Sequence, residues 1–373
     1  MLNLLAISNY RSLRNLIVPL GALNLITGPN GSGKSNVYRA LRLLADTANG
    51  GVVGSLAREG GISSTLWAGP ATQRKEPVAL RLGFHGNEFS YAIDLGLPKL
   101  PSESAFSLDP EIKSECIWHG AQLRPATLLV ERRNGMVRIR RDGGEWEIVE
   151  SHLQPFESMM ERIADPQRAA EVLSLRDQIR SWRFYDHFRT DAEAPARQLQ
   201  IGTYTPVLAH DGRDLAAAMQ TILEIGDGRA LAQAISDAFP GTESDMAGAD
   251  GRLTVGLRQE GLLRPLNVAE LSDGTLRYLL WCAALLTPRP PQLMVLNEPE
   301  SSLHPDLLPA LARLIGVAAK QTQVWVVSHA SRLIAALKEN ERCQSIDLEK
   351  ELGETVVIGQ GALDRPAWKW PGR

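Results

Sequence analysis

The stretch GPNGSGKS, residues 28 to 35, decides the fold of this chain. It matches the pattern G-x-x-x-x-G-K-[ST] and lies between an apolar strand-like run, ALNLITG, and a helical pattern, SNVYRALRLLADTA. Its three glycines permit a tight turn in which successive backbone N–H groups point inward at an anion. The first turn of the following helix adds the positive end of its dipole. The sequence therefore predicts a loop that binds the phosphates of a nucleotide.

The side chains of this loop have distinct predicted tasks. Lys34 is expected to reach the β and γ phosphates of ATP, and the hydroxyl of Ser35 to coordinate Mg²⁺. The helix that follows has an apolar face, which holds Val37, Ala40, Leu41 and Leu44. The residues predicted to bind the nucleotide here are Gly28, Pro29, Asn30, Gly31, Ser32, Gly33, Lys34, Ser35 and Asn36.

Periodic patterns divide the rest of the chain. Residues from about 77 to 150 alternate apolar and polar in several runs separated by turn residues, which is typical of an antiparallel sheet. The pattern turns helical from about 155 to 240. The C-terminal part alternates strands, QLMVLN and QVWVVS, with helices, which indicates a parallel α/β sheet. The two ends of the chain are therefore expected to form two halves of one sheet, with the middle inserted between them.

Composition narrows the class of protein. With 373 residues and a formal charge of −3, the chain has no global basic field that would attract nucleic acid, so any DNA contact would need local patches. The three cysteines lie far apart, as in a cytosolic protein with reduced thiols. The N-terminus lacks the features of a signal peptide, and the longest apolar run is shorter than a membrane span of about 20 residues. We expect a cytoplasmic protein with no membrane partner.

Three further motifs follow in a fixed order. LSDGTLR, residues 271 to 277, opens a helix, and Ser272 is both a natural N-cap and a possible anion ligand. LMVLNEPESSLHP, residues 293 to 305, is a strand that ends on Asn297-Glu298. VWVVSHASRLI is the next strand, and it ends at Ser328-His329.

Together these motifs resemble the ABC-class ATPases of the RecF/SMC type, in particular bacterial stand-alone ATPases that share an architecture with the ATPase half of OLD-family nucleases. The opening ISNYRSL is also similar. The resemblance covers both ends of the chain well and the middle only in layout. It implies an α/β fold: a P-loop NTPase, formed as a single ABC-type ATPase head over residues 1–373. Its expected parts are the Walker A half (1–60), an antiparallel β subdomain (61–160), an inserted helical lobe (161–260) and the signature, Walker B and His-switch half (261–373).

The resemblance also implies roles for single residues. Ser272 and Gly274 would contact the γ-phosphate of ATP bound by the other protomer, which implies a homodimer formed around ATP. Glu298 would polarise the attacking water, SSLHPD would be the D-loop along the dimer seam, and His329 would sense the γ-phosphate. Glu298, His329 and Lys34 are thus the expected catalytic residues.

Asn297 stands where an aspartate is usual. In a P-loop site this position holds Mg²⁺ through water, while Ser35 binds it directly. An amide oxygen still accepts a hydrogen bond from that water, but the substitution removes one negative charge beside a dication. We therefore expect a slow ATPase with a raised Mg²⁺ requirement, in which Ser35 and Asn297 form the metal site.

Several assignments stay open at this level. The Q-loop glutamine is Gln154 or Gln178, and an adenine-stacking role for Tyr10 or Arg11 competes with ordinary core and surface positions. The segments VERRNGMVRIRR and RSWRFYDHFR place arginines beside aromatic residues, as in sites for single-stranded nucleic acid. A solvated sheet face and core aromatics are the favoured interpretation, because the net charge is negative. The tail DRPAWKWPGR either lies along the body or docks a partner.

Two functions compete. The first is an ATPase whose dimer cycle acts on DNA, in repair or phage defence. The alternative is a binding switch with little hydrolysis, or a regulatory subunit whose effector lies on a separate chain. A transport cassette is disfavoured, because more than 250 residues separate the phosphate loop from the strand at 293, where the resemblance implies a much tighter spacing for such cassettes.

Overall fold

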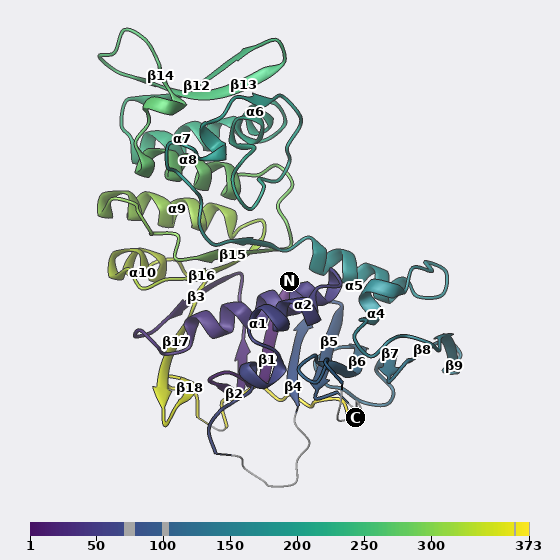
Figure 1. Cartoon of the computed structure of the whole chain (residues 1–373). Coiled ribbons are helices and arrows are strands. Elements are labelled where there is room, and N and C mark those ends of the chain that lie inside the picture. Colours follow the sequence, from purple (N-terminus) through teal and green to yellow (C-terminus); the bar gives the residue numbers. More distant parts are fainter. Residues whose placement is uncertain (71–78, 99–103, 362, 373) are drawn as a thin grey trace. The chain divides into compact units, whose positions relative to one another are not determined.

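The computed structural model describes residues 1–70, 79–98, 104–361 and 363–372. The chain forms two compact units (Figure 1). The first contains Met1–Gly21, Gly28–Trp182 and Ile346–Arg373, and the second contains Ala22–Thr27 and Arg183–Ser345. The short strand before the phosphate loop thus belongs to the second unit, while the loop itself belongs to the first.

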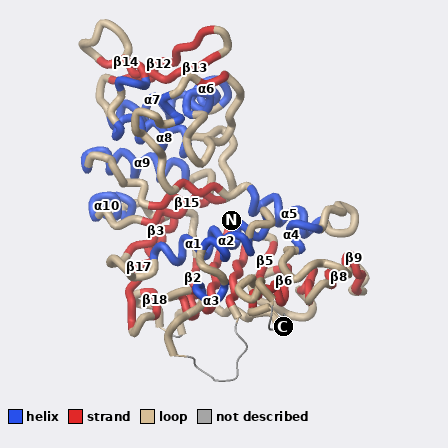
Figure 2. The backbone as a smooth tube through the Cα atoms, viewed as in Figure 1, coloured by secondary structure: helices blue, strands red, loops and turns tan. Residues whose placement is uncertain are grey.

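The first unit is built on an eight-stranded sheet in which every neighbouring pair is antiparallel. Figure 2 draws its strands in red. In order across the sheet, the strands are β2 (Leu13–Pro19), β1 (Leu2–Tyr10), β4 (Leu80–Gly86), β5 (Phe89–Gly96), β6 (Glu111–His119), β7 (Leu128–Arg133), β8 (Met136–Arg140) and β9 (Trp146–Glu150). The predicted antiparallel sheet is confirmed. Strand β6 was not predicted.

Helices and a C-terminal hairpin complete this unit. The helices are α1 (Lys34–Ala48), α2 (Val52–Arg58), α3 (Ile62–Thr65), α4 (Met159–Arg162) and α5 (Ala170–Arg180). The hairpin pairs β17 (Cys343–Glu351), whose first residues belong to the second unit, with β18 (Glu354–Val357). The four apolar residues predicted to face the core from α1 are all buried.

The C-terminal tail lies against the sheet of its own unit. Trp368 and Trp370 pack on Leu4, Ala6 and Ile17 and on a second group around Trp118. The ring centroids of Trp118 and Trp368 are 5.3 Å apart. A Cβ atom on Gly83 would lie 2.7 Å from the Trp368 ring, so glycine makes room for the indole. Of the two alternatives for the tail, packing along the body is the one observed.

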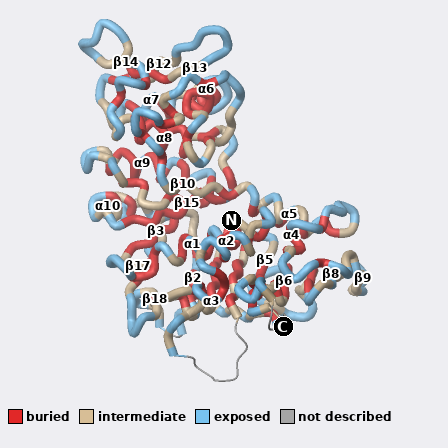
Figure 3. Tube along the Cα trace, in the orientation of Figure 1, coloured by how far each residue is buried: buried red, intermediate tan, exposed pale blue. Residues whose placement is uncertain are grey.

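A parallel sheet forms the centre of the second unit. In spatial order its strands are β10 (Arg183–Tyr185), β15 (Leu293–Asn297), β16 (Gln323–Val327) and β3 (Leu23–Thr27). The predicted parallel arrangement of β15 and β16 is confirmed, and β10, too short to leave a sequence pattern, was not predicted. The helices α8 (Asp273–Leu285), α9 (Leu308–Ala318) and α10 (Ser331–Lys338) follow, and their apolar residues form a continuous core with the sheet (Figure 3).

The rest of the second unit mixes helices and short strands. It holds α6 (Leu215–Ile225), α7 (Gly228–Ala238) and the hairpin of β12 (Thr242–Ala249) and β13 (Arg252–Gln259). Short strands β11 (Gln200–Ile201) and β14 (Leu266–Asn267) pair with β13, and η1 (Pro195–Arg197), η2 (Val268–Glu270) and η3 (Pro305–Leu307) are 3-10 turns. The helical patterns that became α5 and α6 are confirmed. Within the described ranges, no helix has the length and apolar character needed to span a bilayer.

The three cysteines are free thiols. Cys116 on β6 and Cys282 on α8 are buried, and burial raises the pKa of both thiols. Cys343, at the start of β17, is partly exposed. A thiol with a raised pKa carries little thiolate at neutral pH, so we expect the two buried cysteines to react slowly with thiol reagents.

Candidate functional site

The phosphate loop connects β3 to α1. The backbone φ angles of Gly28, Gly31 and Gly33 are 145°, 80° and 107°, a region that favours glycine. Space is also restricted, because a Cβ on Gly28 would lie 2.2 Å from the carbonyl oxygen of Leu348. A Cβ on Gly33 would lie 2.1 Å from Oγ1 of Thr355. Conformation and packing therefore both require the glycines at these two positions.

The polar side chains of the loop fit a phosphate ligand. Nζ of Lys34 donates to the carbonyl oxygens of Gly28 (2.6 Å) and Pro29 (3.0 Å), so the ammonium folds back over the loop. Ser32 is buried, and its hydroxyl has no hydrogen-bond partner among the described residues. Ser35 is exposed in the first turn of α1. A buried hydroxyl without a partner, next to a lysine and a helix start, suits the oxygens of a triphosphate.

A network behind the loop was not predicted. The hydroxyl of Thr355 on β18 donates to the carbonyl oxygen of Ser32 at 2.8 Å and lies 2.7 Å from Oγ of Ser12. Ser12 in turn accepts from Nδ2 of Asn36 at 2.8 Å. The network therefore joins the loop, the start of α1 and the C-terminal hairpin. No motif in the sequence could have indicated it, because Ser12 and Thr355 lie 343 positions apart.

In the second unit, the end of β15 carries the expected acidic residue. Glu298 directly follows Asn297, and its φ is 49°, in the left-handed region that few non-glycine residues adopt. Its backbone N–H donates to the carbonyl oxygen of Val327 at 2.8 Å, which ties it to the end of β16. The Glu298 side chain is 44% exposed. Strained backbone of this kind is found at functional sites more often than elsewhere.

His329 lies beside this glutamate. Its Nδ1 is 3.6 Å from Oε1 of Glu298 and 3.5 Å from Oε1 of Glu300. The two residues predicted to be catalytic at the ends of β15 and β16 are therefore neighbours. Glu300, which was not predicted, is buried and accepts hydrogen bonds from the turn that carries His329. Its position two residues after Glu298, in NEPE, was the available sequence signal.

The signature segment opens α8. Ser272 is exposed and forms the N-cap, its Oγ accepting from the N–H of Thr275 at 3.1 Å. Arg197 holds the segment, because it pairs with Asp273 at 2.9 Å and donates to the carbonyl oxygen of Leu271 at 3.0 Å. A Cβ on Gly274 would lie 3.5 Å from the carbonyl oxygen of Ser302, so the D-loop passes close to this helix start.

Two side chains of α8 also hold the turn after Glu298. Arg277 is buried, which lowers the pKa of its guanidinium, and it donates to the carbonyl oxygen of Ser301 at 3.0 Å. Nε1 of Trp281 donates to the carbonyl oxygen of Pro299 at 3.1 Å. The signature helix is therefore bonded directly to the segment that carries Glu298.

The residues left open for adenine stacking have structural roles. Tyr10 is fully buried, and its hydroxyl donates to Glu59 at 2.9 Å. Burial and the adjacent Glu59 carboxylate raise the pKa of Tyr10. Arg11 forms an ion pair with the same carboxylate at 2.6 Å. Gln154 is exposed and Gln178 is half-buried, and the choice between them as Q-loop residue stays a prediction.

Several arginines of the first arginine-rich segment form ion pairs with carboxylates of the same unit. Arg132 is fully buried and forms an ion pair with the equally buried Glu115 at 3.6 Å. Arg138 pairs with Glu131 and stacks over the ring of Trp146, with its guanidinium carbon 4.6 Å from the ring centroid. In the second segment the buried aromatic residues are Trp182, Tyr185 and Phe188. The core position of these aromatic residues agrees with the favoured interpretation, and a nucleic-acid contact by either segment stays a prediction.

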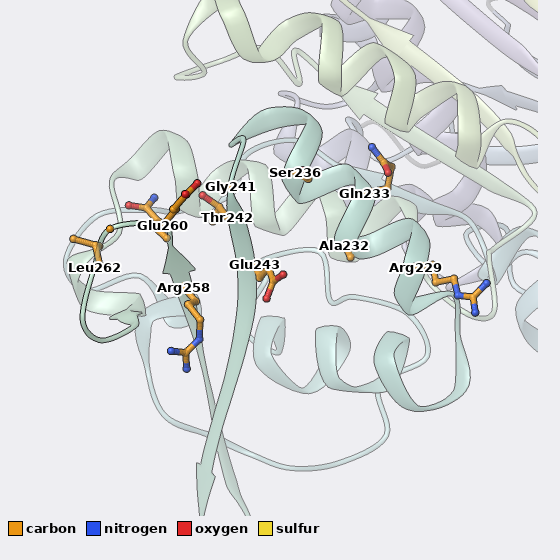
Figure 4. A pocket seen from close by; sticks show the side chains of 12 residues that line it. Arg229, Ala232, Gln233, Ser236, Gly241, Thr242, Glu243, Arg258, Glu260 and Leu262 are labelled. Atoms are coloured by element: carbon orange, nitrogen blue, oxygen red, sulfur yellow. The ribbon is translucent and has the colours of Figure 1, made fainter.

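A polar groove lies elsewhere in the second unit (Figure 4). It has a volume of about 610 Å³ between α7 and the β12–β13 hairpin, and its lining includes Arg229, Glu243, Arg258 and Glu260. None of the residues predicted for nucleotide binding or catalysis lines it. The groove is thus separate from the motif residues.

Comparison with known proteins gives the family. A family model described as "AAA domain, putative AbiEii toxin, Type IV TA system" matches residues 23–335, a span that contains the phosphate loop, Glu298 and His329. The chain belongs to this family. By sequence, none of the curated proteins matches this AAA-domain protein.

Solved structures show the same fold at low sequence identity. The Smc head bound to the C-winged helix domain of ScpA superposes with a TM-score of 0.52 at 14% identity, covering 96% of this chain and 97% of that chain. The Smc head from Pyrococcus furiosus, with an extended coiled coil and bound to the C-terminal domain of ScpA, gives 0.51 at 12% identity, covering 96% and 95%. The predicted fold, a mixed α/β head like that of Smc, is confirmed.

Proposed function

We propose that this protein binds and slowly hydrolyses ATP, and that ATP closes two copies into a dimer. The observation that carries the proposal is the order of the parallel strands. β3, β16 and β15 are neighbours, and their carboxyl ends lead into Gly28, His329 and Glu298. In sheets of this kind the ligand binds outside the carboxyl ends of the strands. The buried hydroxyl of Ser32, which has no protein partner among the described residues, supports phosphate binding.

Each residue then has a defined task. The Lys34 ammonium exchanges the carbonyl oxygens of Gly28 and Pro29 for phosphate oxygens, which bear more negative charge. Glu298 accepts a hydrogen bond from the attacking water and orients it, and His329 donates to the γ-phosphate. Mg²⁺, when bound, neutralises charge on the β and γ phosphates. Ser35 would hold it directly, and the Asn297 amide oxygen would hold it through water.

The amide at Asn297 sets the metal requirement. Because it lacks the charge of an aspartate, we expect half-maximal ATPase activity to need more Mg²⁺ than in an Asn297→Asp variant. A Mg²⁺ titration of both proteins measures the difference. Identical titration curves would mean that Asn297 does not contribute to the metal site.

The dimer part of the proposal rests on the signature segment. Ser272 is exposed at the first turn of α8, where a hydroxyl and free N–H groups can bind an anion from another molecule. Gly274, in the same helix start, is partly exposed. We propose that this segment contacts the γ-phosphate of ATP on the partner copy.

Other partners belong to the same proposal. The family description refers to a toxin–antitoxin system, and the Smc heads of this fold were solved bound to ScpA domains, which supports a role with a second protein chain. A DNA-related process, repair or phage defence, is the setting that we propose. The internally paired arginines of residues 130–141 give a DNA contact little support.

The test compares steady-state ATP turnover of the wild-type protein with that of Glu298→Gln. Glu341→Gln, an exposed position in the same unit, serves as the control. We expect Glu298→Gln to lower turnover by roughly 100-fold or more while ATP still binds. Equal turnover in both proteins would remove Glu298 from catalysis and favour the binding switch. Size-exclusion chromatography of Glu298→Gln with ATP should show a dimer, and a monomer there would contradict ATP-driven closure.

A further inference from the structure

We propose that Glu300 is a positioning residue for His329, and that it links the signature helix α8 to the catalytic end of β16. The proposal rests on the ATPase function above and names a residue that acts through another. Glu300 itself is only 8% exposed and is not expected to touch the nucleotide.

The first observation is the hydrogen bonding of its carboxylate. Oε1 of Glu300 accepts from three successive residues: Oγ of Ser328 (2.7 Å), the N–H of His329 (2.9 Å) and the N–H of Ala330 (3.2 Å). α10 begins at Ser331, and its N-cap, Ala330, has no side chain able to cap it. Glu300 therefore holds, from another segment, the residues that lead into α10. This carboxylate holds the turn that presents His329 together with the Ser328 hydroxyl, which also accepts from the N–H of Ala330 at 3.2 Å.

The second observation concerns the imidazole ring. Nδ1 of His329 lies 3.5 Å from the same Oε1 and 3.6 Å from Oε1 of Glu298. Two carboxylates on one side of the ring favour an orientation in which Nδ1 faces them, which leaves Nε2 for another partner. Glu300 thus acts on His329 twice, through the backbone of the turn and through the ring.

The third observation is that the residues on both sides of Glu300 are hydrogen-bonded to α8. The carbonyl oxygen of the preceding residue, Pro299, accepts from Trp281, and that of the following residue, Ser301, accepts from Arg277. Both donors lie on α8, the helix that starts at the signature segment. A displacement of α8 therefore moves the backbone of Glu300, and the carboxylate carries that movement to His329. This gives the signature helix a route to the catalytic histidine within one protomer.

The presence of a glutamate at the buried position 300 supports a role other than stabilising the fold. A buried carboxylate is costly unless it is well hydrogen-bonded, and Oε2 of Glu300 has no partner among the described residues. An apolar side chain would avoid this cost but would leave the N–H of His329 and the Ser328 hydroxyl without this acceptor. The geometry points to a carboxylate retained for positioning.

The test is a double-mutant cycle between Glu300 and His329, measured as kcat and KM for ATP. Glu300→Ala should lower kcat by roughly 100-fold, because a small misplacement of a catalytic group has effects of this size. The KM should stay within about threefold, because the phosphate loop is unchanged. Glu300→Gln keeps an acceptor oxygen and should recover most of kcat. In a His329→Ala background, Glu300→Ala should have no further effect on kcat, and an additive loss would overturn the proposal.

A second readout does not depend on turnover. The protein has seven histidines, so ¹⁵N-histidine labelling gives few ring signals, and His329→Ala identifies the one from His329. Glu300→Gln should shift this signal, whereas Glu339→Gln, at the exposed end of α10, should not. An unmoved signal would refute the positioning role. If the wild-type protein shows no turnover, the proposed function fails while this signal still decides on Glu300. If Glu300→Ala does not fold, the His329 ring signal of Glu300→Gln decides on the proposal.

Discussion

Replacing Thr355 with valine removes one hydroxyl and keeps the shape of the side chain. In the native protein this hydroxyl donates to the carbonyl oxygen of Ser32 at 2.8 Å and lies 2.7 Å from Oγ of Ser12. The side chain is buried, so water cannot replace the lost contacts. At about 1 kcal/mol for each net hydrogen bond, we expect Thr355→Val to lower the free energy of unfolding by about 2 kcal/mol.

This loss can be measured by thermal unfolding. For a unit of about 200 residues, about 2 kcal/mol corresponds to a fall of about 4–8 °C in Tm. ATP binding should also weaken, because the Ser32 carbonyl sets the path of the phosphate loop. If half of the loss appears in binding, about 1 kcal/mol corresponds to an increase of roughly fivefold in Kd.

The matched control is Thr65→Val. Thr65 is also buried, and among the described residues its hydroxyl donates to one group, the carbonyl oxygen of Ile62 within its own turn, at 2.7 Å. This variant should lose about 1 kcal/mol of stability and bind ATP like the wild type. The reasoning is refuted if Thr355→Val and Thr65→Val have the same ATP affinity and the Tm of Thr355→Val falls by less than about 1 °C.

Three further predictions concern other parts of the chain. A thiol reagent at pH 8 should modify Cys343 alone in the native protein and all three cysteines in urea, because burial raises the pKa of the Cys116 and Cys282 thiols. Modification of all three cysteines in the native protein would contradict this. Glu115→Ala leaves the Arg132 guanidinium buried without its counter-ion and should lower the free energy of unfolding, measured in urea, by about 3–5 kcal/mol. A decrease of less than about 1 kcal/mol would show that this ion pair contributes little to stability. Gly83→Ala should displace Trp368 and shift tryptophan fluorescence to the red while lowering stability by about 1–3 kcal/mol, and an unchanged spectrum would speak against the packed tail.

The parts of the fold that could be predicted are those whose signals are local. The phosphate loop, α1 and the parallel strands β15 and β16 each lie within a few consecutive residues whose period and glycine pattern are clear. The adjacency of Glu298 and His329 also followed, since neighbouring parallel strands end at one edge of a sheet.

The parts that were missed depend on distant partners. β6 carries Glu115 at a buried position, which breaks the alternation of apolar and polar residues. Its burial depends on Arg132 and on hydrogen bonds from Tyr91, Ser158 and Met159, and none of these is its neighbour in the sequence. Strand β10 has three residues and leaves no periodic signal. Thr355 and Glu300 act through hydrogen bonds to backbone groups of other segments, and backbone groups are the same in every sequence.

The left-handed backbone of Glu298 has a consequence for protein engineering. A non-glycine residue in this conformation costs about 1–2 kcal/mol, so a sequence optimised for thermal stability alone would place glycine at position 298. Such a protein would have a higher free energy of unfolding. On the proposed mechanism it would also have lost the carboxylate that orients the attacking water. A stabilised variant for biochemical work should therefore be sought at positions away from the ends of β15 and β16, where the native chain accepts strain to keep a carboxylate in place.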